Sequence, residues 1–503
     1  MVEVGTKRAF DASVRTTEPW DDGPVRLEHD SLGEVAVPAN AYWGVNTARA
    51  IENFAITGRP ISDFPDFIVA YAKVKQAAAR ANAEIGSLSH TRADLIDAAC
   101  AEIARGELLD QFVVDIMQGG AGTSTNMNVN EVIANRGLEL GGYEKGDYDH
   151  LSPNDDVNRS QSTNDTYPTA LKLAIDRQLN RLVAEMELLE ESLAAKAAEF
   201  SRIIKVGRTQ LQDAVPMTLG QEFGGFATMV RESRIDLERS RPALRTISLG
   251  ATAIGTGIAA DPRFAEAARR HLSEITGLDL HTARDLVSTT SDMGPYMQVS
   301  GAINRFAMLL SKICNDLRLL SSGPQAGFGD IKLPERQAGS SIMPGKVNPV
   351  IPESVNQVCF SVLGNDVIVS TASQAGQLQL NAFGPVVANA LLTSEKWLTA
   401  ALVTLRVNCI DGITADERRL GEQSSSLAGI ATAFIPYIGY AAAGQIAHTA
   451  LTTGAGIADL IVDAGLMHRH DVEAIMEPAR LSGLDTSVPQ LTRDYPQARH
   501  ERE

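Results

Sequence analysis

Four polar segments interrupted by glycine carry most of the side chains that could do chemistry in this chain. Each segment alone is typical of a helix cap or a flexible loop. Together, their hydroxyls, carboxamides, backbone N–H groups and one lysine are suited to binding carboxylates, which predicts a small dicarboxylate ligand, although phosphate would use many of the same groups. The candidate residues are Thr123 in GGAGTSTNMNVNE (119–131), Ser162, Thr163 and Asn164 in NRSQSTNDTYPT (158–169), Thr209 and Gln210 in VGRTQLQDAVPMTLGQE (206–222), and Ser340, Ser341, Lys346 and Asn348 in AGSSIMPGKVNPVIPE (338–353).

The fourth segment contains the candidate reactive group. Ser340 follows Gly339 and precedes Lys346 by six residues. Its hydroxyl can act as a base only if the alkoxide is stabilised, and Lys346 and oriented backbone N–H groups would supply that once the loop closes and water leaves. These residues alone leave open whether Ser340 is a base or a nucleophile. A hydrolase triad is disfavoured because the chain has no Gly-x-Ser-x-Gly motif and the four segments contain no histidine.

Long amphipathic helices are expected to position these segments. Apolar residues recur every three or four positions over 171–204, which predicts one helix about 50 Å long that starts after Pro168 and ends before Gly207. Similar patterns predict helices over 221–240, 296–320 and 384–406. We therefore expect a mainly α fold with a central bundle of long helices, and no regular βαβ alternation.

Breaks near residues 160 and 415 predict four parts of the chain. These are a mobile N-terminal arm (1–26), an N-terminal domain (27–160), a central long-helix bundle domain (161–415) and a small C-terminal helical domain (416–503). The stretch between Glu422 and Asp459 contains no Asp, Glu, Lys or Arg. Proline, glycine and polar residues interrupt it, so buried helices and turns are expected rather than a membrane span.

Composition excludes several classes of partner. The chain has 45 Lys+Arg against 62 Asp+Glu and a net charge of −17, which argues against binding nucleic acid or an anionic membrane. Its four cysteines are far apart and form no Cys-x-x-Cys, which predicts buried thiols in a reducing cytoplasm rather than disulfides or a zinc site. The nine histidines suggest no metal cluster either.

The loop GSSIMPGKVNP (339–349) resembles the signature loop of the class II fumarase/aspartase superfamily. The other three segments resemble that family's remaining substrate-binding regions in the right order, and GATAIGTGI (250–258) and SKICNDLRLLSSGP (311–324) are similar to its aspartases. The resemblance runs from about Leu27 to about Arg480. It implies a three-domain fold whose long helices form the core of a homotetramer, with each site shared between three subunits. It also implies no required organic cofactor; any activating divalent metal such as Mg²⁺ would bind at a site that the sequence does not indicate.

Two positions bear on which member of the family is resembled. Fumarases carry His where this chain has Gln210, and Gly-Ser-Gly-Thr where it has Gly-Ala-Gly-Thr (120–123). Dehydration must protonate a poor leaving group and benefits from a titratable partner, whereas a substrate ammonium can leave as neutral ammonia. The expected activity is therefore that of an aspartate ammonia-lyase. A fumarate hydratase and a non-catalytic structural protein on the same scaffold are the alternatives. Argininosuccinate and adenylosuccinate lyases usually have His at this position as well.

The resemblance implies a role for each candidate residue. Ser340 would take the Cβ proton of L-aspartate and leave an enediolate on the β-carboxylate, after which ammonia departs to form fumarate. Gln210 would donate and accept hydrogen bonds. The implied binding groups are Thr123, Ser162, Thr163 and Ser341 for the β-carboxylate, Asn164 with Thr123 for the ammonium, and Thr209, Lys346 and Asn348 for the α-carboxylate.

Overall fold

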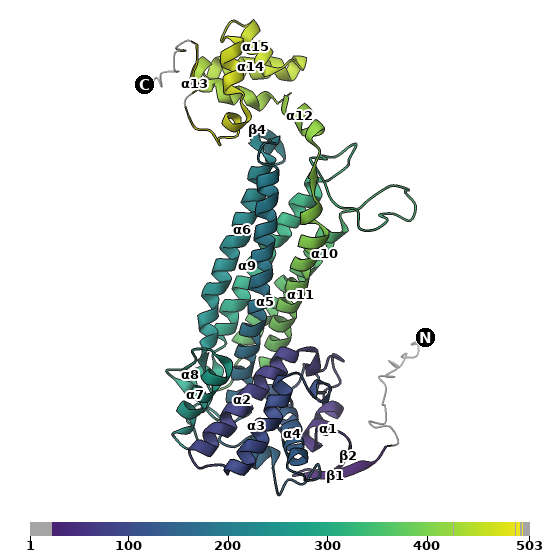
Figure 1. Cartoon of the computed structure of the whole chain (residues 1–503), viewed down its shortest axis with the longest axis vertical. Helices are drawn as coiled ribbons and strands as arrows, with labels where there is room; N and C mark the ends of the chain where they lie inside the picture. Colours follow the sequence, from purple (N-terminus) through teal and green to yellow (C-terminus); the bar gives the residue numbers. More distant parts are fainter. Residues whose placement is uncertain (1–22, 426, 488, 493–494, 496–503) are drawn as a thin grey trace, which may run out of the picture. The chain divides into compact units, whose positions relative to one another are not determined.

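The computed structural model describes residues 23–425, 427–487, 489–492 and 495, and it is 62% helical. The expectation of a mainly α fold is therefore confirmed. The helices are α1 (Val45–Asn53), α2 (Pro65–Glu84), α3 (His90–Ala104), α4 (Thr123–Leu140), α5 (Thr163–Glu199), α6 (Leu219–Ser240), α7 (Phe264–Thr276), α8 (Leu286–Ser291), α9 (Gly294–Leu320), α10 (Val350–Gln374), α11 (Gly384–Asn408), α12 (Glu417–Ser425), α13 (Ile435–Ile438), α14 (Tyr440–Thr453), α15 (Ile457–Asp463), α16 (Arg469–Ile475) and α17 (Pro478–Leu481) (Figure 1).

The strands form small two-stranded sheets. Three pairs are antiparallel and one, β5 with β6, is parallel. Such short ladders connect helices and do not form a layer of their own. The pairs are β1 (Val25–Asp30) with β2 (Gly33–Pro38), β3 (Ile204–Thr209) with β4 (Gln212–Thr218), β5 (Thr246–Ile247) with β6 (His281–Thr282), and β7 (Ile331–Lys332) with β8 (Thr414–Ala415).

The chain folds into two compact units, each assembled from three segments. Four long helices, α5, α9, α10 and α11, contribute residues to both units. The division into three domains and an arm stays a prediction. Residues 1–22 of the predicted arm lie outside the described residues, whereas Val25 and Arg26 belong to β1. Unit 1 comprises Met1–Arg177, Pro242–Tyr296 and Ile368–Leu392, and unit 2 comprises Gln178–Arg241, Met297–Val367 and Thr393–Glu503.

Unit 1 is organised around α2, which packs against α3 and α7. Alanines cover much of the buried surface of α2, and their small side chains let the neighbouring helices approach closely. Phe67 and Tyr71 of α2 meet Tyr167 of α5 edge to face, with ring centroids 5.1 Å apart for Phe67–Tyr167 and 6.2 Å apart for Tyr71–Tyr167. This aromatic cluster fixes the first turns of α5 against α2.

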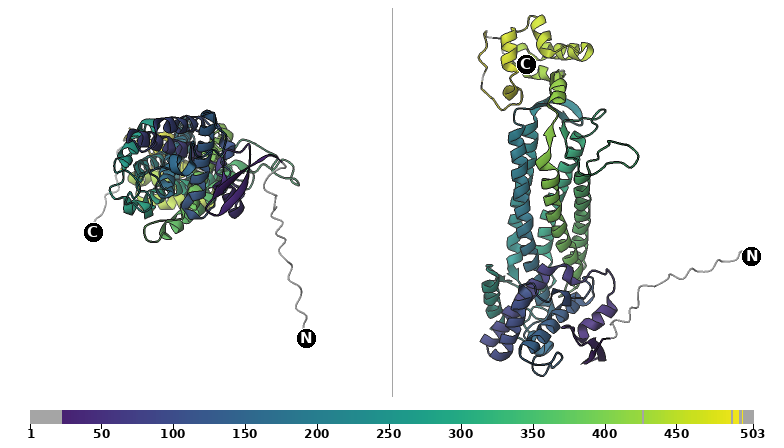
Figure 2. Two further views of the ribbon diagram at one scale, coloured as in Figure 1. Left: turned by 90° about the horizontal axis from the view of Figure 1, so that it is seen from below. Right: turned by 45° about the vertical axis from the view of Figure 1, so that its right-hand side comes forward.

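In unit 2 the long helices run side by side (Figures 1 and 2). Helix α6 begins with a capping box, in which Thr218 and Gln221 each accept a hydrogen bond from the other's backbone N–H. Leucines at helical spacing provide the buried side chains between these helices. Examples with 0% exposure are Leu182, Leu193, Leu237, Leu310, Leu317 and Leu402.

The C-terminal helices of unit 2 have their own small core, which includes Phe434, Ile461 and Val472. The described part of the uncharged stretch before Asp459 forms short helices and turns as expected, but these are only partly buried, since Tyr440 and Leu451 of α14 are exposed. Among the described residues, no helix combines the length and the apolar content that crossing a membrane requires. All four cysteines are free and buried, which confirms that they were correctly predicted to be buried thiols.

The helix predicted over 171–204 needs correction at both ends. Helix α5 starts at Thr163 and includes Pro168, and it stops at Glu199. Pro168 removes one backbone donor near the helix start, which the remaining hydrogen bonds tolerate. Phe200 continues the apolar pattern beyond the helix because its ring packs on Phe223, at 5.3 Å, and Ile204 already belongs to β3.

The other three predicted helices are confirmed as α6, α9 and α11. Helix α10 was not predicted, because further apolar residues outside its buried stripe of Val355, Cys359, Val362, Val369 and Ala372 obscure the helical spacing. Several of them, including Phe360 and Val367, are exposed in the monomer.

Candidate active site

The first two polar segments lie together in unit 1. Thr123 is the first residue of α4 and Thr163 the first of α5, so both segments lie at helix N-termini, where backbone N–H groups have no partner within the helix itself. The hydroxyl oxygen of Ser162 accepts the N–H of Asn164 at 3.2 Å. A cavity of ≈ 30 Å³, lined by Ala121, Thr163 and Asn164, shows that the two segments adjoin. It has room for about two water molecules.

A tight turn places Thr123 beside α5. Gly120, Ala121 and Gly122 all have positive φ values, of 77°, 57° and 92°. A Cβ atom at Gly122 would collide with the ring of Tyr167, so only glycine fits there. The hydroxyl of Thr123 donates to the carbonyl of Gly120 at 2.7 Å. The glycine-rich sequence thus serves a close approach between α4 and α5.

The buried carboxylate of Asp165 holds the segment over 158–169 in place. Asp165 is fully buried and accepts backbone N–H groups from Ser162 at 3.0 Å, Gly250 at 3.1 Å and Thr252 at 2.9 Å. Burial raises the pKa of Asp165 to about 6, although these donors and the charge of Lys75 oppose the shift. The carboxylate joins the start of α5 to the loop over 250–252.

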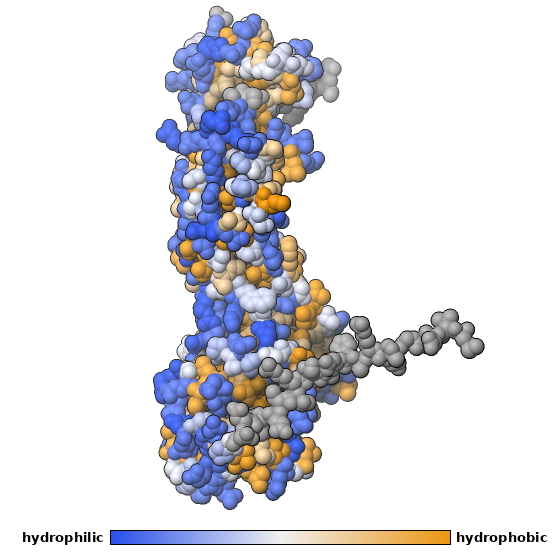
Figure 3. Space-filling model, turned by 90° about the vertical axis from the view of Figure 1, so that its right-hand side faces the viewer, coloured by the Kyte–Doolittle hydropathy of each residue, from blue (hydrophilic) through white to orange (hydrophobic). Residues whose placement is uncertain are grey.

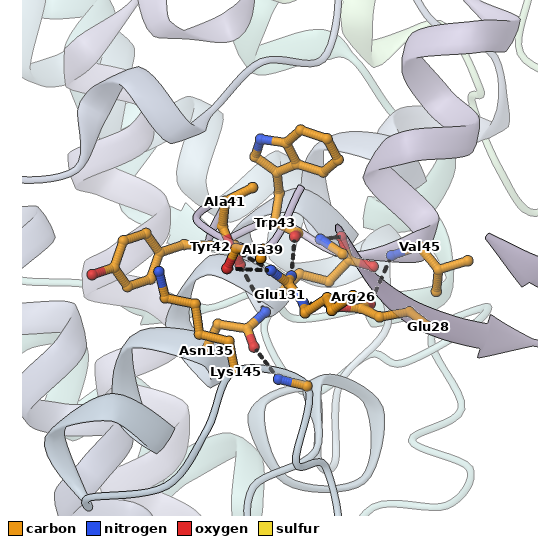
Figure 4. Close-up of polar contacts among 12 residues, drawn as sticks. Arg26, Glu28, Ala39, Ala41, Tyr42, Trp43, Val45, Glu131, Asn135 and Lys145 are labelled. Carbon is orange, nitrogen blue, oxygen red and sulfur yellow. Dashed lines mark hydrogen bonds and ion pairs between the residues drawn. The ribbon is translucent and has the colours of Figure 1, made fainter. Parts of the chain in front are cut away.

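A second buried carboxylate joins α4 to α1 (Figure 4). Glu131 of α4 accepts the backbone N–H groups of Gly44 at 2.8 Å, Asn46 at 2.8 Å and Thr47 at 3.2 Å, and the Thr47 hydroxyl at 2.7 Å. Glu28 accepts the N–H of Val45, which lies between Gly44 and Asn46, at 2.9 Å. These carboxylates satisfy the N-terminal donors of α1 and complement its dipole. Burial is the main cause that raises the pKa of Glu131.

The third segment forms the turn of the β3–β4 hairpin in unit 2. Thr209 pairs with Gln212, and the two residues between them, Gln210 and Leu211, have φ values of 55° and 63°. Positive φ at both positions is the type I′ pattern, which favours Asn-Gly. For residues with a Cβ, such as Gln210 and Leu211, each positive φ costs about 1–3 kcal/mol of backbone strain, and such strain is typical of functional positions.

The fourth segment is a loop between β7 and α10. The hydroxyl oxygen of Ser340 accepts the N–H groups of Ile342 at 3.2 Å and Met343 at 2.9 Å. The amide of Asn348 donates to the carbonyl of Gly339, which closes the neck of the loop. Two donors already converge on the Ser340 oxygen, the arrangement that would stabilise an alkoxide there.

Cations gather beside this loop. A cavity of ≈ 580 Å³ in unit 2 is lined by Lys346 and Asn348 together with Arg318, Lys332 and Glu335. Three cations against one carboxylate favour an anionic ligand. Ser341 is exposed at the edge of the same loop.

The structure places the predicted residues in both units, and it brings together only the two segments of unit 1. Unit 1 holds Thr123 with 162–164, and unit 2 holds the turn over 209–210 and the loop over 340–348. Within the described part of unit 2, the cavity beside Lys346 is lined by neither Thr209 nor Gln210.

Sequence reasoning did not identify the buried ionisable side chains behind the segments, namely Lys75, Glu131 and Asp165. A signal was available for Lys75, because it shares the helical spacing of Phe67, Ile68 and Tyr71 on α2. A lysine on such an apolar face needs polar partners. Asp165 and Glu131 carry no comparable pattern.

No metal site is evident in the described residues, where no group of three or more His, Cys, Asp or Glu side chains is arranged to hold an ion. Lys172 is one of the ionisable side chains that line the small cavity of unit 1. Its ammonium donates to the carbonyl of Thr246 at 2.7 Å, and burial lowers its pKa to about 8.

Comparison with known proteins identifies relatives over most of the chain. A family model described as "Lyase" matches residues 33–364, and one described as "Fumarase C C-terminus" matches residues 430–483. The aspartate ammonia-lyase of Pseudomonas fluorescens is 52% identical over 91% of this chain and 96% of its own length. That of Escherichia coli K12 is 48% identical over 91% of this chain and 96% of its own.

Solved structures give the same picture. A fumarate lyase:delta crystallin from Brucella melitensis, bound to cobalt, is 48% identical, with a TM-score of 0.89 over 91% of this chain and 100% of the other. A class II fumarase from Schistosoma mansoni is 32% identical, with a TM-score of 0.86 over 91% of this chain and 99% of the other.

Proposed function

Because this chain belongs to the class II fumarase/aspartase superfamily of lyases, we propose that it is an aspartate ammonia-lyase, which converts L-aspartate reversibly to fumarate and ammonia. The observation that carries the proposal is 52% identity with the aspartate ammonia-lyase of Pseudomonas fluorescens, against 32% with the class II fumarase of Schistosoma mansoni. Gln210 in the strained turn supports the same choice, because an ammonium leaves as neutral ammonia without a titratable partner.

The reaction begins with the Ser340 alkoxide, which takes the proton from Cβ of L-aspartate. The electron pair of the broken C–H bond moves onto the β-carboxylate as an enediolate. It then re-forms as the Cα=Cβ double bond while the Cα–N bond breaks, and the ammonium nitrogen leaves as neutral ammonia. The N–H groups of Ile342 and Met343 already point to the Ser340 oxygen, and they stabilise its charged form.

The two groups of binding residues divide the substrate between them. Thr123, Ser162 and Thr163, with Ser341 from the loop, hold the β-carboxylate and its additional charge, and Asn164 with Thr123 orients the ammonium. The α-carboxylate binds Thr209, Lys346 and Asn348. Lys346 supplies the positive charge, as its place in a cavity with two further cations supports.

We also propose a homotetramer in which three subunits contribute to each site. The long helices of unit 2 leave large apolar side chains exposed in the monomer, including Met308 at 54%, Phe360 at 59% and Trp397 at 42%. Figure 3 shows hydrophobic patches among the hydrophilic residues of one face. Exposed apolar surface on long helices is typical of a face that packs against further copies of the chain.

The proposed steps need no organic cofactor, because side chains supply the base and the groups that stabilise charge. An activating divalent cation such as Mg²⁺ stays a prediction with no assigned site. The four buried thiols support a reducing cytoplasm as the location.

The proposal is tested by following fumarate absorbance with L-aspartate and, separately, with L-malate as sole substrate. Fumarate should form from L-aspartate. Formation only from L-malate would mean a hydratase, and formation from neither would favour a structural protein. Ser340→Ala should abolish turnover, whereas the matched control Ser354→Ala, at an exposed position near the start of α10, should not.

The shared site is tested by complementation. Ser340→Ala and Thr163→Ala should each be inactive, and co-expression of the two should restore part of the activity if the residues of one site come from different subunits. Mixed tetramers without any recovered activity would contradict the shared site. A monomer that retains full activity in sedimentation velocity would contradict both parts of this assembly.

A further inference from the structure

Lys75 is a lysine with no exposed surface in the middle of α2. Its amine donates to the side-chain oxygens of Asn158 at 3.1 Å and of Gln161 at 3.0 Å. Burial lowers the pKa of Lys75 to about 7, and a neutral amine has two N–H bonds, one for each of these acceptors. An apolar side chain at this position would avoid the desolvation cost, so packing alone does not account for a lysine.

The side-chain oxygen of Asn158, which accepts from Lys75, also accepts from two residues of α4. The side-chain amides of Asn126 and Asn130 donate to Asn158 Oδ1 at 3.0 Å and 3.2 Å. The amide of Asn158 in turn donates to the backbone carbonyl of Gln161 at 3.3 Å. One carboxamide thus connects α2, α4 and the residue that directly precedes Ser162.

A second contact joins α4 to the first turn of α5. The hydroxyl of Thr166 shares its proton between the carbonyl of Ser162 at 3.0 Å and Asn126 Oδ1 at 3.3 Å. It also lies 3.2 Å from the hydroxyl of Tyr71 on α2. Helices α2, α4 and α5 therefore share one buried hydrogen-bond network behind the substrate segments. In such a network, the loss of one member leaves its partners unsatisfied.

Resting on the proposed function, we propose that Lys75 is a positioning residue of the active site, which acts through Asn158 and Gln161 to fix Ser162–Asn164 at the start of α5 relative to Thr123 at the start of α4. Neither Lys75 nor Asn158 lines the cavity between these segments. Lys75 acts on catalysis only through the residues that it holds.

The kinetic consequence follows from the division of the substrate. The segments that Lys75 positions stabilise the charge that develops on the β-carboxylate during the reaction, while the α-carboxylate binds Lys346 in unit 2. Misplacement of the first group therefore weakens transition-state binding more than substrate binding. Displacements near 1 Å cost up to about 100-fold in rate.

The experiment is a double-mutant cycle with Lys75→Met and Gln161→Ala, followed by fumarate formation from L-aspartate. Each single variant should lower kcat by about 10- to 100-fold while KM changes by less than about 3-fold. The double variant should lose less than the product of the two single losses, because both changes break the bond between Lys75 and Gln161, while Gln161→Ala also removes the bonds from its amide to the carbonyls of Val157 and Arg159. Losses that multiply, a change confined to KM, or wild-type kinetics would overturn the proposal.

Ile96→Ala is the matched control, because Ile96 is a fully buried residue of α3 in the same unit and lies outside the polar network. It should lower the melting temperature and leave kcat unchanged. An equal loss of kcat in Ile96→Ala would show that Lys75→Met acts only through stability. If Lys75→Met does not fold, the kcat of Gln161→Ala alone tests the proposal, because Gln161 is partly exposed. A wild-type protein inactive with L-aspartate would refute the proposed function, whereas an active one with unaffected variants would refute only the role of Lys75.

Discussion

Replacement of Arg26 is expected to loosen the segment that leads into α1. The guanidinium lies among carbonyl groups of residues 38–43 (Figure 4) and donates to those of Pro38 at 3.0 Å, Ala41 at 2.7 Å and Trp43 at 2.6 Å, and to the Glu28 carboxylate at 2.7 Å. The segment over 39–44 has no helix or strand of its own, so the side chain of Arg26 substitutes for secondary structure there.

The magnitude follows from the burial of the acceptors. Ala41 and Trp43 are only 7% and 6% exposed, so Arg26→Met leaves two buried carbonyls without this donor. Each such loss costs about 1–3 kcal/mol, or roughly 2–6 kcal/mol together. Pro38 is less buried, and water can replace its bond. Glu28 keeps the hydroxyl of Tyr148 as a donor at 3.0 Å.

Hydrogen exchange read by mass spectrometry is the appropriate assay, because it reports local opening in a chain too large for one global unfolding step. The amides of 44–47, which Glu28 and Glu131 hold, should exchange at least ~30-fold faster in Arg26→Met, since 1.4 kcal/mol is tenfold. Arg26→Lys should give a smaller increase, because its ammonium has three donors.

Arg105→Met is the matched control, because Arg105 pairs with Glu107 while both side chains are more than half exposed. Such a pair contributes at most about 1 kcal/mol, so exchange at 44–47 should not change. If Arg26→Met left these amides within about threefold of wild type, the carbonyls would have other partners and the reasoning from burial would be wrong.

Three further predictions follow from the same structure. Lys346→Ala should raise KM for L-aspartate by at least about tenfold with a smaller effect on kcat, as measured in the fumarate assay, and an unchanged KM would contradict its role in binding the α-carboxylate. The folded pKa of Asp165, about 6 against 3.8 when unfolded, means that its stabilising contribution is complete below pH 3.8 and is lost as pH rises through 6. This loss totals ~3 kcal/mol. After correction for the intrinsic pH dependence of exchange, the free energy of local opening at the amides of 250–252 should therefore fall in wild type relative to Asp165→Asn by about 1 kcal/mol between pH 5 and pH 7.5, and parallel curves would contradict the assignment. Leu211→Gly should stabilise the β3–β4 hairpin by about 1 kcal/mol, because glycine relieves the positive φ, and an unchanged or lower melting temperature would show that the turn is not strained.

The sequence by itself determined the family and most of the long helices. The four polar segments form continuous motifs, so their chemistry is legible without coordinates, and helical spacing identified α6, α9 and α11. It did not determine the ends of α5. Phe200 continues the apolar pattern past the helix because its ring packs on Phe223 of α6, and this contact cannot be read from local spacing. Helix α10 was missed because exposed apolar residues, among them Phe360, Val367 and Ile368, obscure its buried stripe.

Only the tertiary structure identified the buried contacts that hold the motifs in place. Gly122 is required because the ring of Tyr167 occupies the space of a Cβ, and that contact joins residues 45 positions apart. Lys75, Glu131 and Asp165 each bind groups far along the chain, such as Gln161, 86 residues from Lys75. Side-chain types and local spacing are properties of a sequence, whereas the desolvation and hydrogen-bond partners of a buried charge depend on which distant segments the fold brings into contact.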